Sequence, residues 1–190
     1  MKKRKAKQGE KIHLIKVTLS DWYGRVRGMP YRILAVPEGS TLYNLAEAIV
    51  DSFDFDFDHC FGFYDNIKRW TESTEGYELF ADIGEESKFK SVKRTKINEV
   101  FDKIKKKMLF LFDYGDEWHF IVELKGTESP EEDAKYPLVR SLLEKPLHNI
   151  GIGKWMKRMN HRKTSPNRAY LAKVRSTIAR YARNVRRKNH

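Results

Sequence analysis

Only one cysteine and no long apolar segment occur in this chain of 190 residues, and both absences exclude classes of protein. Cys60 has no second cysteine with which to form an internal disulfide, so a reducing, cytoplasmic setting is expected. No stretch approaches the ~18 consecutive apolar residues of a membrane span. The basic N-terminus MKKRKAK has no apolar segment behind it, as a secretion signal would. We therefore predict neither membrane insertion nor secretion.

Motifs that bind phosphate groups, activate a nucleophile or hold a metal ion are also missing. The chain has no GxSxG, no GxxxxGKS or GxxxxGKT, and no GxGxxG after a predicted strand. Its six histidines show no HExxH spacing and no zinc-site pairing with cysteine. Asp54, Asp56 and Asp58 alternate with phenylalanines but lack the glycine and final glutamate of a calcium loop. We expect no metal ion and no cofactor, and an enzyme is the less favoured interpretation.

Acidic residues are absent from the last part of the chain. The whole chain has 38 basic and 26 acidic residues, a net charge of +12. Residues 154–190 contain thirteen Lys and Arg and no Asp or Glu, whereas residues 8–153 carry a net charge of −6. Such asymmetry predicts a polyanionic partner, DNA or RNA. The alternative is that the basic segment packs on the acidic body of its own or a neighbouring subunit, since both use the same attraction.

The pattern after the N-terminal arm predicts two strands and a helix. Residues 11–19 and 31–37 have the apolar alternation and β-branched content of strands, and their Gly- and Pro-rich connection favours an antiparallel pair. Ser40 or Thr41 is the candidate N-cap of a helix whose apolar residues recur at helical spacing until about Phe53.

Shorter elements are predicted between residues 53 and 125. Strands are expected at 60–64 and 77–81. A helical face is expected over 97–104, formed by Ile97, Val100, Phe101 and Ile104. The apolar segments MLFLFDY and WHFIVEL are predicted to be two strands around a tight loop.

The tight loop carries the hexapeptide DYGDEW, Asp113 to Trp118. Together with LIKVTL, YRILAVPEGSTLYNLAEAI and FDFDHCFGFY upstream, this succession resembles the plasmid pRiA4b ORF-3-like protein family. The resemblance spans residues 11–125 and implies an α+β fold: a mixed β-sheet with a helix packed across one face, similar to a β-grasp core. It implies no known reaction, and family members occur in plasmid and mobile-element settings.

The acids of the loop have two competing interpretations. Asp113 and Asp116 beside Gly115 are typical of a tight turn, because aspartate accepts hydrogen bonds from nearby backbone N–H groups and glycine adopts positive φ. The alternative is a ligand or reaction site assembled in space from four candidate residues: His59, Asp116, Trp118 and His119.

Strand geometry weakens that alternative. Many family members carry a histidine two residues after the tryptophan, where this chain has Phe120. His119 comes one position earlier, and successive residues of a strand point to opposite faces, so His119 is predicted to face away from Trp118.

The basic segment is predicted to contain an amphipathic helix. Ser165 and Pro166 form a strong start signal, and an apolar stripe runs from Leu171 to Val185 with arginines mainly opposite. Interleaved arginine and aromatic residues suit phosphate contact and stacking. An anionic membrane surface or a partner's groove is the alternative, and the narrow stripe argues against the membrane. The residues expected to bind nucleic acid are Lys157, Arg158, Arg162, Lys163, Arg168, Lys173, Arg175, Arg180, Arg183, Arg186 and Arg187.

These patterns divide the chain into four parts: a basic flexible arm (1–10), the α+β domain (11–125), a connecting segment with a short helix (126–153) and a basic helical extension (154–190). The favoured function is a non-catalytic nucleic-acid-associated accessory protein. The alternatives are a small enzyme or ligand-binding protein with a pocket near the hairpin, and a protein–protein adaptor whose tail pairs with an acidic body.

Overall fold

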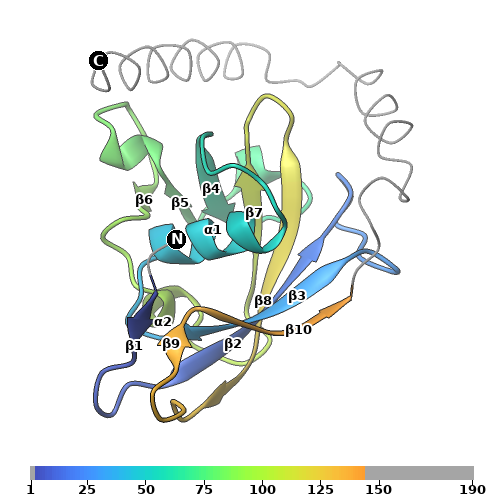
Figure 1. The fold of residues 1–190 in the computed structure, drawn as a ribbon. Helices are drawn as coiled ribbons and strands as arrows, with labels where there is room; N and C mark the ends of the chain where they lie inside the picture. Colours follow the sequence, from blue (N-terminus) through green and yellow to red (C-terminus); the bar gives the residue numbers. More distant parts are fainter. Residues whose placement is uncertain (1–2, 144–190) are drawn as a thin grey trace. The chain divides into compact units, whose positions relative to one another are not determined.

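Eight strands form one open sheet in the order β10-β3-β2-β8-β7-β4-β5-β6 (Figure 1). This is a computed structural model, and it describes residues 3–143. All neighbouring strands are antiparallel except β5 and β6. The strands of the sheet are β2 (Ile12–Leu19), β3 (Tyr31–Pro37), β4 (Phe61–Tyr64), β5 (Gly76–Glu78), β6 (Lys90–Ser91), β7 (Lys107–Phe112), β8 (Trp118–Glu128) and β10 (Leu138–Leu143). The fold is thus α+β with an open, mixed sheet, as the sequence predicted in outline.

The predicted antiparallel pair is confirmed and lies within the sheet, one strand from its β10 edge. β2 pairs with β3 on one side and with β8 on the other, so both of its edges are hydrogen-bonded. Ile15 pairs with Leu34 and Val17 with Val122, and all four side chains are buried. Burying apolar surface on a paired strand is the main favourable contribution to this core.

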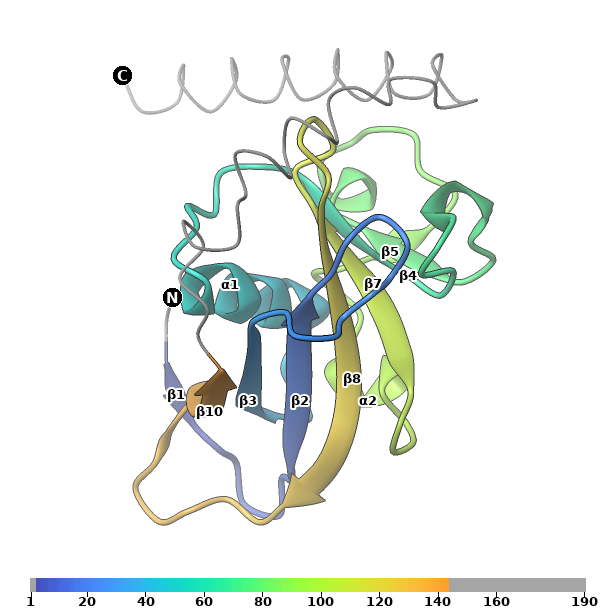
Figure 2. The ribbon, with the colours of Figure 1, turned by 90° about the vertical axis from the view of Figure 1, so that its right-hand side faces the viewer.

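Helix α1 (Leu42–Ser52) lies across one face of the sheet, also as predicted (Figure 1). The N-cap is Thr41: its hydroxyl accepts the N–H of Asn44, whose side chain in turn bonds the Thr41 backbone. The apolar positions at helical spacing are buried: Leu42, Leu45, Ala46, Ile49 and Val50. Figure 2 shows that the β2–β3 loop lies on the other side of β8 from α1.

The predicted flexible arm is wrong for the described residues 3–10. Strand β1 (Arg4–Lys5) pairs with β9 (Lys135–Tyr136) in a small second sheet. The Arg4 guanidinium donates to both carboxylate oxygens of Glu10, at 2.7 and 2.8 Å. This hydrogen-bonded ion pair lowers the pKa of Glu10 to about 2. The charge of Arg4 is therefore paired with a carboxylate and is not free in solution.

The predicted boundary at residue 125 is too early. β8 continues to Glu128, and β10 pairs with β3 at the sheet edge, so the domain reaches at least Leu143. Residues 126–143 contain strands and turns but not the expected short helix, and residues 144–153 lie outside the described residues. Strand β10 escaped prediction because its side chains are largely exposed and show no apolar alternation.

Two of the shorter elements differ from their predictions. The strand expected at 77–81 ends at Glu78 and is followed by a 3-10 turn (Phe80–Asp82); a second 3-10 turn spans Trp70–Glu72. Helix α2 covers only Ile97–Val100, and Ile104, expected on its buried face, is 59% exposed. After the helix, residues 101–106 form an irregular segment with a turn that leads into β7. Within residues 3–143, no helix combines the length and apolar character needed to cross a membrane.

Candidate functional site

The DYGDEW segment forms the turn between β7 and β8, and its first aspartate organises it. Asp113 has a φ of 56°. Its side chain accepts the N–H of Gly115 at 2.8 Å, and its carbonyl accepts the N–H of Glu117 at 2.6 Å. The second positive φ of the turn belongs to Glu117, at 52°, and not to Gly115 as expected. The predicted turn role of Asp113 is confirmed, and aspartate is among the residues that tolerate this left-handed conformation best.

His59 lies near this turn and contacts Asp113 rather than the predicted Asp116. Its Nδ1 is 2.5 Å from the Asp58 carboxylate, and its Nε2 is 3.5 Å from Oδ2 of Asp113. The ring is 40% exposed on its side-chain atoms, so water screens both interactions. Neighbouring Cys60 is buried, and burial raises the pKa of its thiol to about 12. Burial thus disfavours the thiolate, which is the reactive form of cysteine.

Trp118 belongs to the face of the sheet that α1 covers. It pairs in register with Phe112, and its ring packs edge-on against Phe55 with centroids 4.8 Å apart. Phe55 also contacts Phe112 and Phe120. Phenylalanine thus alternates with aspartate in residues 53–58 so that aromatic rings pack over the hairpin. Trp118 completes this apolar layer.

His119 faces the opposite side, as strand alternation predicted. It pairs in register with Leu111, is only 2% exposed, and stacks on Trp22 of the β2–β3 loop with centroids 5.6 Å apart. Neither ring nitrogen has a hydrogen-bond partner in the structure. Burial lowers the pKa of His119 from 6.5 to about 4, with Asp21 opposing the shift weakly. The imidazole is therefore neutral at physiological pH.

The four candidate residues do not converge on one site. His59 and Trp118 lie on the α1 side of the hairpin, His119 lies on the other side of the sheet, and Asp116 is exposed in the turn. Among residues 3–143, no three His, Cys, Asp or Glu side chains are grouped so as to hold a metal ion. The residues predicted to bind nucleic acid, from Lys157 to Arg187, lie outside the described residues.

A buried polar cluster that the sequence did not reveal lies beneath Tyr114 of the hexapeptide. The Tyr64 hydroxyl donates to Glu78 at 2.6 Å and lies 2.6 Å from the Tyr114 hydroxyl. Ser87 donates to the other oxygen of Glu78 at 2.8 Å. Glu78 is only 2% exposed. The hydroxyls therefore supply the hydrogen bonds that water would give to an exposed carboxylate.

Gly62 was the available signal for that cluster. A glycine inside an apolar strand marks a place where other atoms approach the backbone closely. A Cβ at Gly62 would lie 2.6 Å from the Tyr64 hydroxyl and 2.8 Å from the Tyr114 hydroxyl. The cluster is enclosed by aromatic rings of Trp70, Phe80 and Phe89, and it supports the turn rather than presenting a carboxylate to a substrate.

This arrangement defines a class: an α+β domain with an open mixed sheet, a helix on one face and an aspartate-organised hairpin. The chain belongs to the plasmid pRiA4b ORF-3-like protein family, whose model matches residues 11–166. No curated protein matches it. A similar fold occurs in the crystal structure of a protein of unknown function from Methanosarcina mazei Go1, which is 20% identical, with 85% of this chain and 87% of that chain covered and a TM-score of 0.59.

Proposed function

We propose that this protein is a non-catalytic, nucleic-acid-associated accessory protein that contacts phosphate groups through the basic residues of 154–190. The observation that carries the proposal is the charge distribution: thirteen Lys and Arg without one acid, joined to an acidic body. The dispersed positions of His59, Asp116, Trp118 and His119 favour a binding role over a catalytic one. The proposal includes a cytoplasmic location, a mobile-element setting, a helix within 154–190 and a β-grasp-like core.

Arginine is the residue best suited to this role. Its planar guanidinium stays charged and donates two parallel hydrogen bonds to a phosphate. Each phosphate neutralised on duplex DNA releases condensed counterions, so the logarithm of the affinity falls with the logarithm of the salt concentration by ~0.9 per contact. Contacts to phosphate carry little sequence information, so we expect binding that is strongly salt-dependent and weakly sequence-dependent.

The test uses the full chain and fluorescently labelled DNA duplexes and single strands of several sequences, titrated across a salt series. The tail variant carries Arg175→Ala, Arg180→Ala and Arg183→Ala. A charge-matched control carries three substitutions of exposed, separated body lysines: Lys11→Ala, Lys68→Ala and Lys103→Ala.

Wild-type binding should weaken steeply with salt, and the tail variant should lose up to ~2.7 from the slope if each arginine neutralises one phosphate. The control should stay close to wild type. A wild-type affinity that does not fall with salt, or equal losses in the two variants, would overturn the proposal.

A further inference from the structure

Five basic residues without an acidic neighbour in sequence lie together at the β6 edge of the sheet. This basic strip consists of Lys88, Lys90, Lys93, Arg94 and Lys96, and all five are exposed. None of their side chains forms an ion pair or hydrogen bond with another residue of 3–143. The rest of 3–143 has 18 basic and 25 acidic residues and is therefore net negative, whereas the strip is positively charged.

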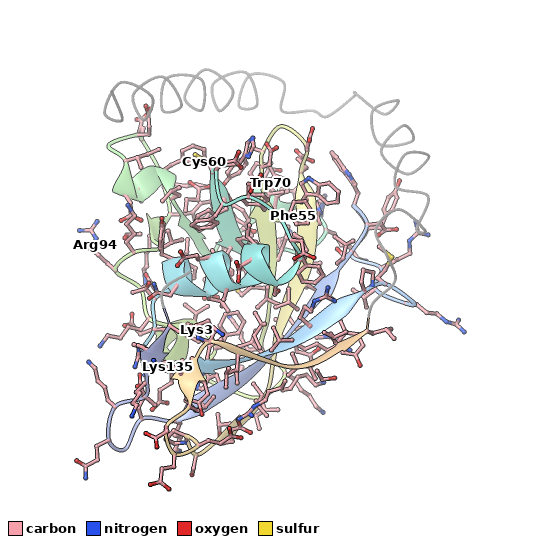
Figure 3. The ribbon with its side chains drawn as sticks, viewed as in Figure 1. Lys3, Phe55, Cys60, Trp70, Arg94 and Lys135 are labelled. Carbon is pink, nitrogen blue, oxygen red and sulfur yellow. The ribbon has the colours of Figure 1, made fainter. Side chains whose placement is uncertain are left out.

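The backbone under the strip is held in place by buried polar residues. Ser91 is 6% exposed; its hydroxyl donates to the Asp82 carboxylate and accepts the N–H of Arg94 at 3.0 Å. The other oxygen of Asp82 accepts the N–H of Lys93 at 3.2 Å, and the Thr95 hydroxyl donates to the Ser91 carbonyl at 2.7 Å. These bonds fix a turn from which Lys93 and Arg94 point outward (Arg94 is labelled in Figure 3).

The same turn is joined to the start of α1. The N–H groups of Leu42 and Tyr43 donate to the carbonyls of Thr95 and Val92, each at 3.0 Å. The Lys93 ammonium lies over the Tyr43 ring, 5.2 Å from its centroid. Because turn and helix share these hydrogen bonds, the cations sit on a rigid support, and a ligand would pay little entropy to order the backbone.

A role in preventing the β6 edge from pairing with another chain would explain only part of the basic strip. Lysine on an edge strand discourages pairing with another chain. β6, however, is only two residues long, and Lys90 is the only cation of the strip within it. The other four lie before or after the strand. Glu86 and Glu99 flank the strip on either side and limit it to this turn.

We propose that the basic strip is a second phosphate-binding surface, which contacts the backbone of the nucleic acid independently of residues 154–190. The inference deepens the proposed function and rests on it. A group of cations on a fixed backbone in an otherwise acidic body would also orient the nucleic acid, since phosphates are repelled by the acidic surface elsewhere. Contact here is to phosphate, so it adds affinity without adding sequence preference.

The test substitutes Lys90→Ala, Lys93→Ala and Arg94→Ala together in the full chain. Binding of a fluorescently labelled DNA duplex is measured across a salt series beside the charge-matched control and the tail variant described above. The strip variant should lose about 1 to 3 from the salt slope, at ~0.9 per phosphate contact, and bind more weakly than the control at low salt. Thermal unfolding checks that all variants remain folded, because substitutions of exposed side chains usually change stability little.

The outcomes separate the two proposals. If the tail variant binds weakly while the strip variant equals the control, the strip is not a phosphate site and the proposed function stands. If wild type shows no salt-dependent binding, both fail. If polyglutamate, at equal charge concentration, competes with the duplex as well as unlabelled DNA does, the assignment to a nucleic-acid backbone is overturned in favour of an acidic protein.

Discussion

Replacing His119 with leucine perturbs a buried imidazole whose two nitrogens have no hydrogen-bond partner. Leucine fills a similar volume and can keep apolar contact with Trp22, on which the imidazole stacks. A neutral imidazole has one N–H donor and one acceptor nitrogen. Leaving either buried and unpaired costs about 1–3 kcal/mol. We therefore expect His119→Leu to be as stable as wild type at neutral pH, or more stable by about 1 kcal/mol.

The larger expected effect is on the pH dependence of stability. Burial lowers the pKa of His119 in the folded protein to about 4, whereas the unfolded chain titrates near 6.5. The unfolded state therefore binds the proton more tightly, and folding stability falls as the pH decreases from about 6.5 towards 4. The loss is roughly 2 kcal/mol at pH 5 and about 3.4 kcal/mol once both states are protonated.

Urea unfolding at several pH values between about 7.5 and 5 measures this effect. The His119→Leu variant should lose roughly 2 kcal/mol less than wild type across that interval. His13 also has a lowered pKa, because it is largely buried, but its contribution is common to both proteins. His59→Gln is the matched control, because it removes an imidazole whose side chain is 40% exposed rather than buried.

Two results would refute this reasoning. If His119→Leu were destabilised by more than about 2 kcal/mol at neutral pH, the imidazole nitrogens would have to be making strong hydrogen bonds in solution. If the variant instead kept the wild-type loss of stability in acid, another group would be responsible for it.

Three further perturbations test other parts of the domain. Gly62→Ala should cost about 1–3 kcal/mol in urea unfolding, because its Cβ would lie 2.6 and 2.8 Å from two tyrosine hydroxyls. Gly126→Ala, with nothing within 4 Å, is the control, and equal losses would contradict the packing argument. Arg4→Ala should raise the pKa of Glu10 from about 2 towards its ordinary value in an NMR titration. The pairing stabilises the fold above pH 4.5 and is lost as the pH falls to about 2; an unchanged Glu10 titration would show that the pair does not form. Thr41→Ala removes the N-cap of α1 and should lower stability by about 1 kcal/mol, and no loss in thermal unfolding would refute the capping role.

The elements that the sequence predicted well are those with strong local signals. β3 begins and ends at the expected residues, 31 and 37. Most of its residues are apolar, and Pro37 and Gly39 mark its end in the sequence. The cap at Thr41 and the apolar spacing of α1 are likewise contained within about twelve residues. Asp113 was identified as a turn residue because its chemistry acts on the next few backbone groups.

Features that depend on distant parts of the chain could not be predicted. β1 forms only because β9 is available more than a hundred residues later, and the charge pattern of the arm gives no sign of that pairing. The burial of the Glu78 carboxylate likewise depends on Tyr64 and Ser87, whose hydroxyls donate to it. Three-dimensional pairing decided both cases, and periodicity within a single segment carries no information about it.

The hexapeptide explains why a strong family motif need not mark a reaction site. Tyr114 extends to the buried cluster around Glu78, Trp118 packs on Phe55, and His119 stacks on Trp22. The turn and the start of β8 therefore contribute to three separate layers of packing on two faces of the sheet, and truncation of Tyr114 or Trp118 would leave a cavity or an unpaired polar group. Turn hydrogen bonds and packing account for Asp113, Tyr114 and Trp118 of the family motif. A binding function must then be sought where several cationic side chains lie together without an ion pair or hydrogen bond, and among residues 3–143 the basic strip meets that condition.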